Sequence, residues 1–385
     1  MPSPRPSPEG RGSSKPSPSG KGSDEGAAGA ILEIDLDAIA ANWRSLRDRH
    51  PTGAVAAVVK ADGYGLGAWV IAARLHREGC RHFFTAQFDE AVAIRDVVPD
   101  AILATLNGLL PGTAPEYAAR DILPVLGSLT EIEAWAAEAR RAGRSLPALL
   151  HIDTGMSRLG LDTGELASLR VDGTRLDGIA LRCVMTHLVS SEVPDDPTNA
   201  RQLRRFADAC AAFPGIPRSI ANSSAMFLGA DYMADLARPG AALYGINPTP
   251  GRPNPMRPVV RLLARVLQVR DIPAGETVGY NGIWRADRPS RIATVGVGYA
   301  DGWHRAHSGR GAAFFDGGPV PLVGRVSMDL TTYDVTGRPE IGPGAILELI
   351  GPSIPPDIVA EAGGTNGYEV LTSLGRRFAR TYRGA

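Results

Sequence analysis

A lysine that follows a short apolar run is the residue of this chain with the clearest chemical potential. The run Ala57-Val58-Val59 leads into Lys60, and the segment 61–67 then turns through three glycines into residues typical of a helix. Burial disfavours the charged form of a lysine, so a lysine at the end of a buried strand holds more neutral amine. The neutral amine attacks carbonyl carbons, as a lysine that carries pyridoxal phosphate in a Schiff base must do. The simpler alternative is a lysine whose ammonium extends from the strand end into solvent.

Further polar motifs follow predicted strands later in the chain. They occupy residues 151–160, 185–188, 221–224 and 238–245. Because the carboxyl ends of parallel barrel strands meet at one rim, we expect these motifs to share that rim with Lys60. Three more motifs, at 277–284, 298–303 and 323–329, lie in a later region of strands and turns.

Taken in order, these motifs resemble those of the alanine racemase family, and the resemblance covers residues 31–383. It implies an α/β fold, with an N-terminal (β/α)8 TIM barrel followed by a C-terminal mostly β domain. It implies a pyridoxal-phosphate-dependent racemase that interconverts L-alanine and D-alanine by two-base proton transfer at the α-carbon and supplies D-alanine for peptidoglycan. It also implies a homodimer whose active site is shared across subunits.

The resemblance assigns the proton carriers and the residues around the cofactor phosphate. Lys60 and Tyr280 are expected to be the catalytic pair on opposite faces of the α-carbon, with Lys60 also holding the cofactor. Racemisation removes a proton from one face and delivers one to the other, so two flanking groups suit it. The expected phosphate contacts are Tyr64, Ser223 and backbone amides near Gly240 and Ala241.

The remaining expected roles concern the cofactor ring and the substrate. Arg238 is expected to face the pyridine nitrogen; a guanidinium stays protonated, so it donates a hydrogen bond there but yields no proton. His187 is expected beside the ring, and Arg158 at the cofactor's phenolic oxygen and the substrate carboxylate. The substrate contacts implied by the resemblance are Arg158, Met328, Tyr299 and Asp329.

Position alone leaves a simpler interpretation open for several of these residues. Ser223 can cap a helix, and Arg238 can form a salt bridge at a strand end. His187 can be a satisfied structural group, and Tyr280 can be a packing residue in a turn region. The ordered set of motifs favours the catalytic interpretation over these alternatives.

Three positions depart from the pattern of the family. His151 stands where many members have a lysine that becomes carbamylated and steadies the arginine, so Arg158 must be positioned otherwise. Leu374 replaces a tyrosine that contacts phosphate in some members, and Ser219 replaces a histidine found beyond the pyridine-facing arginine. These departures affect the affinity for the cofactor and the positioning of the arginines. They do not affect the reaction itself, because none of them removes a group that does the chemistry.

Composition excludes several other classes of protein. The 385 residues include 41 basic and 41 acidic side chains, so no net charge attracts nucleic acid or a membrane surface. The three cysteines are far apart, without disulfide or zinc spacing, and no metal is expected. No apolar run is long enough to span a bilayer, and no apolar segment follows the basic N-terminus, so a cytoplasmic location is expected.

The pattern of elements divides the chain into three parts. Residues 1–28 are rich in Pro, Ser and Gly and predict a disordered tail; residues 29–254 predict the barrel, and residues 255–385 the β-rich domain. A strand is expected at 31–36, followed by a helix capped by Asp37. The eight expected barrel strands are 54–60, 82–87, 101–107, 123–126, 148–153, 179–187, 218–222 and 236–244. The second domain is expected to have strands at 259–272, 291–299, 312–315, 320–326 and 345–350, and one helix at 367–377.

Four other functions fit the sequence less well than alanine racemisation. A serine or broad-specificity racemase of the same family is the nearest alternative. A decarboxylase of the ornithine type would share the architecture, but its late cysteine-bearing motif is absent. A non-catalytic pyridoxal-phosphate-binding protein has one domain, so the region from Val259 onward and Tyr280 argue against it. A structural or interaction protein leaves Lys60 and Tyr280 unexplained.

Overall fold

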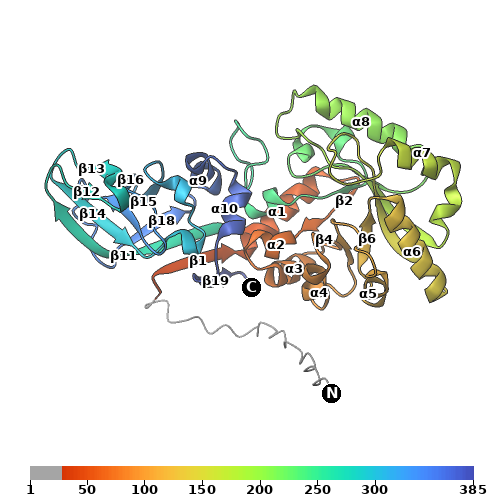
Figure 1. The fold of residues 1–385 in the computed structure, drawn as a ribbon, viewed down its shortest axis with the longest axis horizontal. Coiled ribbons are helices and arrows are strands. Elements are labelled where there is room, and N and C mark those ends of the chain that lie inside the picture. The colour runs from red at the N-terminus through yellow and green to blue at the C-terminus, as the bar shows by residue number, and fades with distance from the viewer. Residues whose placement is uncertain (1–27) are drawn as a thin grey trace, which may run out of the picture.

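The computed structural model describes residues 28–385, so the tail expected at 1–28 lies almost entirely outside the described residues. The chain forms a barrel and a separate β domain, side by side along the longest axis of the molecule (Figure 1). Seven parallel strands run in the order β3-β4-β5-β6-β7-β8-β9, and β10 pairs in parallel with β2. These strands are β2 (Ala54–Val55), β3 (Ala57–Val58), β4 (His82–Thr85), β5 (Ile102–Thr105), β6 (Leu123–Leu126), β7 (Leu146–His151), β8 (Ile179–Met185), β9 (Arg218–Ser219) and β10 (Leu236–Ala237).

Backbone hydrogen bonds close these strands into a barrel. The amide of Arg238 donates to Ala221 O at 2.8 Å, which joins the end of β10 to the segment after β9. On the other side, the amides of Ala56 and Val58 donate to Ala237 O and Pro239 O at 2.9 and 3.1 Å. Strands β2 and β3 therefore act as one interrupted strand, and the predicted eight-stranded barrel is confirmed. Beyond β10 the chain turns at Pro239, which has no amide to donate, so the strand expected at 236–244 is cut short.

Helices on the outside of the barrel bury one apolar face each against the strands. They are α1 (Leu36–Arg49), α3 (Ala68–Arg77), α4 (Phe88–Arg95), α5 (Ala114–Ala119), α6 (Leu129–Ala142), α7 (Thr163–Val171) and α8 (Pro197–Cys210). In α6, for example, Ile132, Trp135, Ala136 and Ala139 are buried at helical spacing, and Ser128 caps the first turn. The amphipathic stretches 66–78, 130–142 and 199–213, which the sequence predicts as helices, correspond to α3, α6 and α8.

The second domain is built on an eight-stranded sheet in the order β14-β17-β16-β15-β18-β11-β1-β19, with a further pairing of β14 to β11. Its strands are β1 (Ala30–Asp35), β11 (Val260–Ile272), β14 (Ser290–Val295), β15 (Ala312–Phe315), β16 (Gly318–Val323), β17 (Thr331–Asp334), β18 (Ile346–Ile350) and β19 (Ala379–Arg383). A short hairpin, β12 (Thr277–Val278) and β13 (Trp284–Arg285), lies at the far end of the domain. Helices α9 (Pro356–Gly363) and α10 (Gly367–Ser373) lie between the sheet and the barrel (Figure 1).

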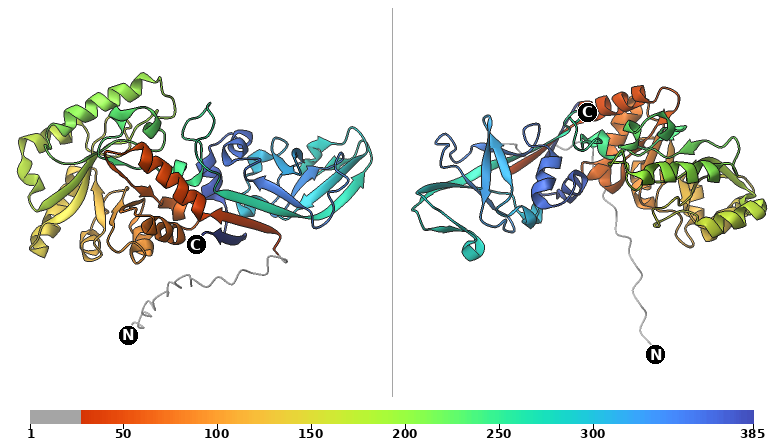
Figure 2. Two further views of the ribbon diagram at one scale, coloured as in Figure 1. Left: turned by 180° about the vertical axis from the view of Figure 1, so that it is seen from behind. Right: turned by 90° about the horizontal axis from the view of Figure 1, so that it is seen from above.

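The strand expected near residue 31 exists, but it belongs to the second domain and not to the barrel range 29–254. Strand β1 pairs antiparallel with β11 and parallel with β19, and Figure 2 shows it running on from α1 into the sheet. The cap of α1 is Asp35, whose Oδ1 accepts from the amide of Ala38 at 2.8 Å; the prediction of Asp37 is wrong. Asp37 lies in the first turn and pairs with Arg74 instead.

The C-terminal segment also differs from the expected helix 367–377. Helix α10 ends at Ser373, Leu374 is extended, and residues 379–383 form β19 on the free edge of β1. Because Gly375 interrupts the helix and the following residues can pair with β1, the edge strand forms there. Helix α9, which begins at Pro356, and strands β12, β13, β17 and β19 were not predicted; proline at the first helical position is a start signal.

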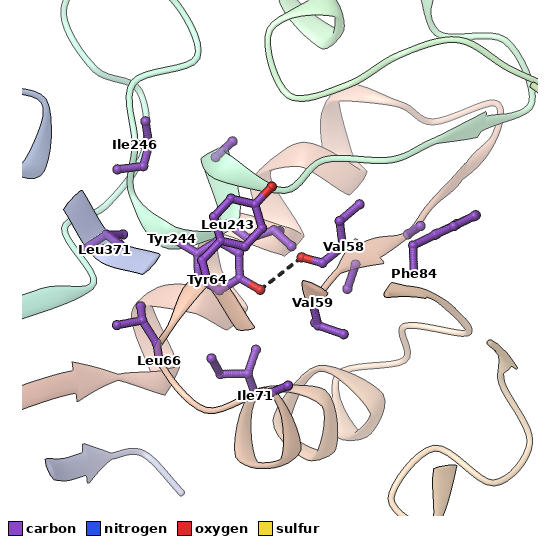
Figure 3. Close-up of a cluster of buried hydrophobic side chains, with 14 of the residues drawn as sticks. Val58, Val59, Tyr64, Leu66, Ile71, Phe84, Leu243, Tyr244, Ile246 and Leu371 are labelled. Carbon is purple, nitrogen blue, oxygen red and sulfur yellow. Dashed lines mark hydrogen bonds between the residues drawn. The ribbon is translucent and has the colours of Figure 1, made fainter. Parts of the chain in front are cut away.

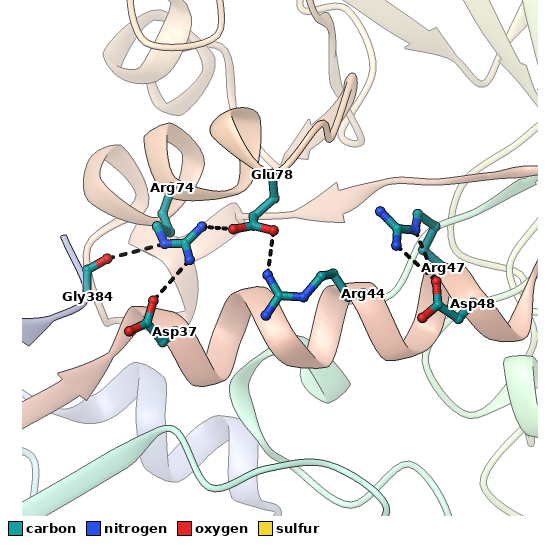
Figure 4. Close-up of polar contacts among 7 residues, drawn as sticks. All are labelled: Asp37, Arg44, Arg47, Asp48, Arg74, Glu78 and Gly384. Carbon is teal, nitrogen blue, oxygen red and sulfur yellow. Dashed lines mark hydrogen bonds and ion pairs between the residues drawn. The ribbon is translucent and has the colours of Figure 1, made fainter.

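A hydrogen bond links the residue after β19 to the barrel helices, next to ion pairs that join α1 and α3 (Figure 4). Arg74 of α3 donates to Gly384 O at 3.2 Å and to the carboxylate of Asp37 in α1 at 3.0 Å. Glu78, one turn further along α3, accepts from both Arg74 and Arg44. The C-terminus therefore docks against α1 and α3 and fixes the edge of the sheet relative to the barrel.

Among residues 28–385, no helix combines the length and apolarity required to cross a membrane. The three cysteines, Cys80, Cys183 and Cys210, are buried and unpaired. The described residues contain no cluster of metal-ligating side chains.

Candidate active site

A cavity of about 880 Å³ opens at the carboxyl ends of the barrel strands, with α10 of the second domain forming part of its wall. Eight residues that the motifs singled out line this cavity together: Lys60, Tyr64, Arg158, His187, Ser223, Arg238, Gly240 and Ala241. They come from the ends of several strands, which is how a barrel assembles an active site. From α10, Tyr368, Glu369 and Thr372 face the same space.

Lys60 begins an unusual turn directly after β3. It is the first residue of α2 (Lys60–Tyr64), within which Ala61, Asp62, Gly63 and Tyr64 have φ angles of 52°, 53°, 63° and 56°. This left-handed conformation costs roughly 1–2 kcal/mol for each residue that has a Cβ, so surrounding contacts must hold the turn. The turn places Lys60 at the mouth of the cavity.

Contacts from the barrel hold the beginning of this turn. The amide of Ala61 donates to Glu90 Oε1 at 2.7 Å, while Glu90 Oε2 accepts from the amide of Ala86 at 2.8 Å. Asp62 Oδ1 accepts from the amide of Ala68 at the start of α3. Glu90 was not predicted as a site residue; its place three residues after Gln87, in a capping box behind a strand, was the available signal.

The surroundings of Lys60 favour its neutral form. Burial is the main cause that lowers the pKa of this amine; the positive charge of Arg158 adds to it, and Glu90 opposes it. Lys60 is also the only lysine among residues 28–385, since the other two lysines of the chain are Lys15 and Lys21. No other side-chain amine of the described part can take its place.

Tyr64 and Ser223 meet at one end of the cavity. The Tyr64 ring stacks on Tyr244 with centroids 4.5 Å apart, and Tyr244 Oη donates to Val58 O at 3.0 Å (Figure 3). A Cβ at Gly240 would overlap the Tyr64 hydroxyl, so only glycine allows this approach. Tyr244 lies within the motif at 238–245, and its contacts could not be predicted from the sequence because they depend on the fold.

Ser223 is fixed by two backbone amides. Its Oγ accepts from Gly240 N at 3.0 Å and from Ala242 N at 3.1 Å, which leaves the hydroxyl proton of Ser223 to donate elsewhere. Gly240 therefore uses its amide on Ser223 and not on a group in the cavity. The Tyr64 and Ser223 hydroxyls together form a donor pair suited to an anionic oxygen, as in a phosphate.

Arg238 lies at the floor of the cavity and is only 4% exposed. Its Nη2 donates to Thr186 O at 2.6 Å and its Nη1 to Ser219 Oγ, and Ser219 in turn donates to Leu236 O at 2.5 Å. Burial lowers the pKa of Arg238 to about 10, so the guanidinium remains charged at neutral pH. No carboxylate pairs with Arg238 in the part of the chain that the structure covers, and a neutral hydrogen-bond acceptor in the cavity fits such a cation.

The two histidines of the cavity are neutral. Burial, followed by the charge of Arg238, lowers the pKa of His187 to about 3 and that of His151 to about 4. An uncharged imidazole can lie against an aromatic ring without adding charge to it. His151 therefore cannot supply the negative charge that a carbamylated lysine would bring to Arg158.

The loop that carries Arg158 is organised by Asp153 at the end of β7. The Asp153 carboxylate accepts from the amides of Gly155, Met156 and Ser157 at 2.8–2.9 Å. Arg158 itself is exposed at the cavity. The loop backbone, rather than a charged neighbour at position 151, thus determines where the Arg158 side chain begins.

The four motif residues of the second domain do not line this cavity. Tyr280 lies in η5 (Tyr280–Gly282) and is 68% exposed, and Tyr299 lies in η6 (Tyr299–Asp301). The amides of Tyr299 and Ala300 donate to the carbonyls of Ser327 and Met328, so Tyr299 and the half-exposed Met328 lie side by side. The carboxylate of Asp329 is engaged by Arg377 at 2.8 Å.

These features define a barrel whose cavity brings one lysine together with a donor pair suited to an anion and a buried arginine. Comparison with known proteins identifies its family. Residues 34–248 match the family model for the alanine racemase N-terminal domain, and residues 259–382 match that for the C-terminal domain. The chain belongs to the alanine racemase family and is an amino-acid racemase.

Three relatives illustrate the similarity. The chain is 54% identical to the alanine racemase of Acidiphilium cryptum, covering 91% of this chain and 98% of that protein. It is 48% identical to a protein of Mesorhizobium japonicum named alanine racemase, catabolic, over 94% of this chain and 95% of that one. The crystal structure of alanine racemase from Bartonella henselae with covalently bound pyridoxal phosphate has a TM-score of 0.90 at 41% identity, over 92% and 100% of the two chains. The predicted family and the two-part fold are confirmed.

Proposed function

We propose that this racemase interconverts L-alanine and D-alanine with pyridoxal phosphate held at Lys60. The observation that carries the proposal is the position of Lys60, the only lysine of residues 28–385, at the mouth of a cavity that also holds Tyr64, Ser223 and Arg238. When bound, the cofactor supplies an aldehyde that links to amines and a ring that draws electrons from the substrate α-carbon.

The residues of the cavity fit that cofactor from end to end. The hydroxyls of Tyr64 and Ser223 would bind its phosphate, and Arg238 would donate a hydrogen bond to its pyridine nitrogen. Because a guanidinium yields no proton, Arg238 would make the ring a weaker electron acceptor than an acidic partner would, which would limit side reactions. His187, neutral and beside the ring, adds no charge there. Arg158 orients the substrate carboxylate through its fork of donors.

Two groups on opposite faces of the α-carbon carry the protons. Lys60 removes or returns the proton on one face, which its lowered pKa favours. Tyr280 serves the other face from a second subunit, because within one chain its exposed ring lies outside the cavity. The proposed assembly is therefore a homodimer in which the partner's Tyr280, Tyr299, Met328 and Asp329 complete each barrel mouth.

Exposed apolar side chains on the second domain support this assembly. Tyr280, Ile283, Tyr299, Met328 and Leu330 are each more than 40% exposed, an apolar set that a partner surface would cover. Asp329 contributes by holding the loop that carries Met328, since its carboxylate is bound by Arg377. Sedimentation of the purified protein tests the dimer, and a monomer with full activity would contradict the shared site.

Alanine is the proposed substrate because Tyr280, Tyr299 and Met328 would leave room for a methyl side chain and little more. A packed wall discriminates against one added methylene by about 10- to 200-fold, so weak activity on serine or 2-aminobutyrate is compatible with the proposal. A chiral assay across a panel of L-amino acids tests it. Turnover of lysine or arginine with kcat/KM comparable to that of alanine would favour a broad-specificity racemase.

We further propose that the enzyme acts in the cytoplasm and supplies D-alanine for peptidoglycan. The relative of Mesorhizobium japonicum that is named catabolic favours a second candidate role, in the breakdown of alanine. Deletion of the gene separates the two roles. A requirement for added D-alanine during growth supports supply, whereas a growth defect confined to media in which one enantiomer of alanine is the nutrient supports breakdown.

A further inference from the structure

The far end of the Lys60 turn is also held from outside the barrel, by the C-terminal strand β19. Arg380 Nη1 donates to Gly65 O at 2.7 Å, and Tyr382 Oη donates to Leu66 O at 3.0 Å. Arg380 and Tyr382 are two residues apart, so both side chains leave the same face of the strand. Two carbonyls in succession are thereby fixed from outside the barrel.

Two glycines allow this close approach. A Cβ at Gly65 would lie 2.5 Å from Leu371 O of α10, and a Cβ at Gly67 would overlap the Tyr382 hydroxyl. The turn is consequently enclosed by α10 and β19, both of which belong to the second domain.

Arg380 also binds the segment that leads to the second-domain motifs. Its Nη2 donates to Leu374 O at 3.3 Å and to Gly375 O at 3.2 Å, and the amide of Gly375 donates to Asp301 O at 2.9 Å. Asp301 is buried and ends the short helix that begins with Tyr299. One guanidinium therefore connects the Lys60 turn to the backbone that presents Tyr299.

We propose that Arg380 is a positioning residue that holds the left-handed Lys60 turn in register with the Tyr299 segment. The proposal rests on the proposed role of Lys60 as the cofactor-bearing residue. An arginine suits this position because its planar guanidinium donates to three carbonyls at once, those of Gly65, Leu374 and Gly375. The ammonium group of a lysine has no such fixed, planar set of donors. Without these bonds the strained turn relaxes, and the Lys60 amine loses its fixed direction into the cavity.

The test compares Arg380→Gln with the matched control Arg383→Gln in the full-length protein. Arg383 lies on the same strand but on the opposite face, where it is exposed and pairs with Glu33 at 3.0 Å. Amide hydrogen exchange of the cofactor-free protein measures how firmly the turn is held. Titration with pyridoxal phosphate measures cofactor affinity, and steady-state kinetics give kcat and KM.

Loss of charge-assisted hydrogen bonds predicts that Arg380→Gln exchanges amides 61–67 about 10- to 100-fold faster, with cofactor affinity and kcat falling by a similar factor. KM for alanine should change by no more than about twofold, because Arg380 does not line the cavity. Arg383→Gln should match the wild type in every measurement. Tyr382→Phe, which keeps the ring and removes one hydroxyl, should show a smaller loss in the same segment.

Wild-type exchange and affinity in Arg380→Gln would overturn the proposal. Equal losses in Arg383→Gln would also overturn it, since they would assign the effect to docking of the whole strand. If Arg380→Gln does not fold, Tyr382→Phe decides between the same outcomes. A wild-type protein without racemase activity would refute the proposed function, while the exchange comparison would still decide whether Arg380 holds the turn.

Discussion

Replacement of Ser219 by alanine should weaken both the barrel and the placement of Arg238. Ser219 is fully buried, and its hydroxyl links the Arg238 guanidinium to the carbonyl of Leu236. Alanine fills nearly the same volume, so the change removes two hydrogen bonds and creates almost no cavity. It also leaves a guanidinium N–H without its partner next to a fully buried position.

The expected magnitude follows from these two bonds. A hydrogen bond to a charged group contributes about 1.5–3 kcal/mol, and a bond between neutral groups about 0.5–1.5 kcal/mol. The free energy of unfolding of the Ser219→Ala protein should therefore fall by about 2–4 kcal/mol. The rate of racemisation should fall too, because Arg238 loses the contact that directs it toward the cavity.

Urea unfolding of the cofactor-free protein measures the stability change, with Ser290→Ala as the matched control. Ser290 is also buried but makes a single neutral bond, to Arg288 O at 2.8 Å, and its loss should cost about 1 kcal/mol. A double-mutant cycle with Arg238→Met should give a coupling energy of about 1.5–3 kcal/mol. A coupling energy near zero, or equal losses for the two serine variants, would refute this account of Ser219.

Three further changes test other parts of the site. Tyr280→Phe should leave cofactor binding intact but slow racemisation by at least about 100-fold, more in one direction than the other; near-wild-type rates both ways would make Tyr280 a packing residue. Because burial holds the pKa of His151 at about 4 and of His187 at about 3, against 6.5 when unfolded, the unfolded chain binds more protons below pH 6.5. The free energy of unfolding should fall as the pH drops from about 6.5 to about 4, by up to about 3 kcal/mol from His151 alone, and a His151→Gln variant that keeps the full slope would contradict this. Gly67 has a φ of 104° and lies against the Tyr382 hydroxyl, so Gly67→Ala should lower both the melting temperature and the cofactor affinity. If both quantities keep their wild-type values, Gly67 and Tyr382 are not in tight contact.

Much of the barrel could be predicted from local pattern. Strand β6 matches its expected bounds, and Lys60 follows the first barrel strand as the apolar run indicated. The membership of β1 could not be predicted, because alternating apolar residues indicate a strand but not its partners. Its partner β11 begins at Val260, far along the chain, and that pairing depends on the packing of the whole second domain.

The detailed geometry of the site could not be predicted from the sequence either. The turn after Lys60 has left-handed backbone angles at Ala61, Asp62 and Tyr64, which few residues with a Cβ adopt. The types of these residues therefore do not predict the turn. Ser219 was recognised only as a departure, while the structure shows it bound to Arg238. The contact of Arg380 with the turn arises from tertiary packing and leaves no local signal, and the capping box of Gln87 and Glu90 indicates a helix start but not the contact of Glu90 with the turn.

Borohydride reduction of the purified enzyme loaded with pyridoxal phosphate, followed by peptide mass spectrometry, determines which residue holds the cofactor. We expect a phosphopyridoxyl group on Lys60, the only lysine of residues 28–385, and none in the Lys60→Ala protein, which should also be inactive. A label confined to Lys15 or Lys21, or full racemase activity in Lys60→Ala, would contradict this expectation.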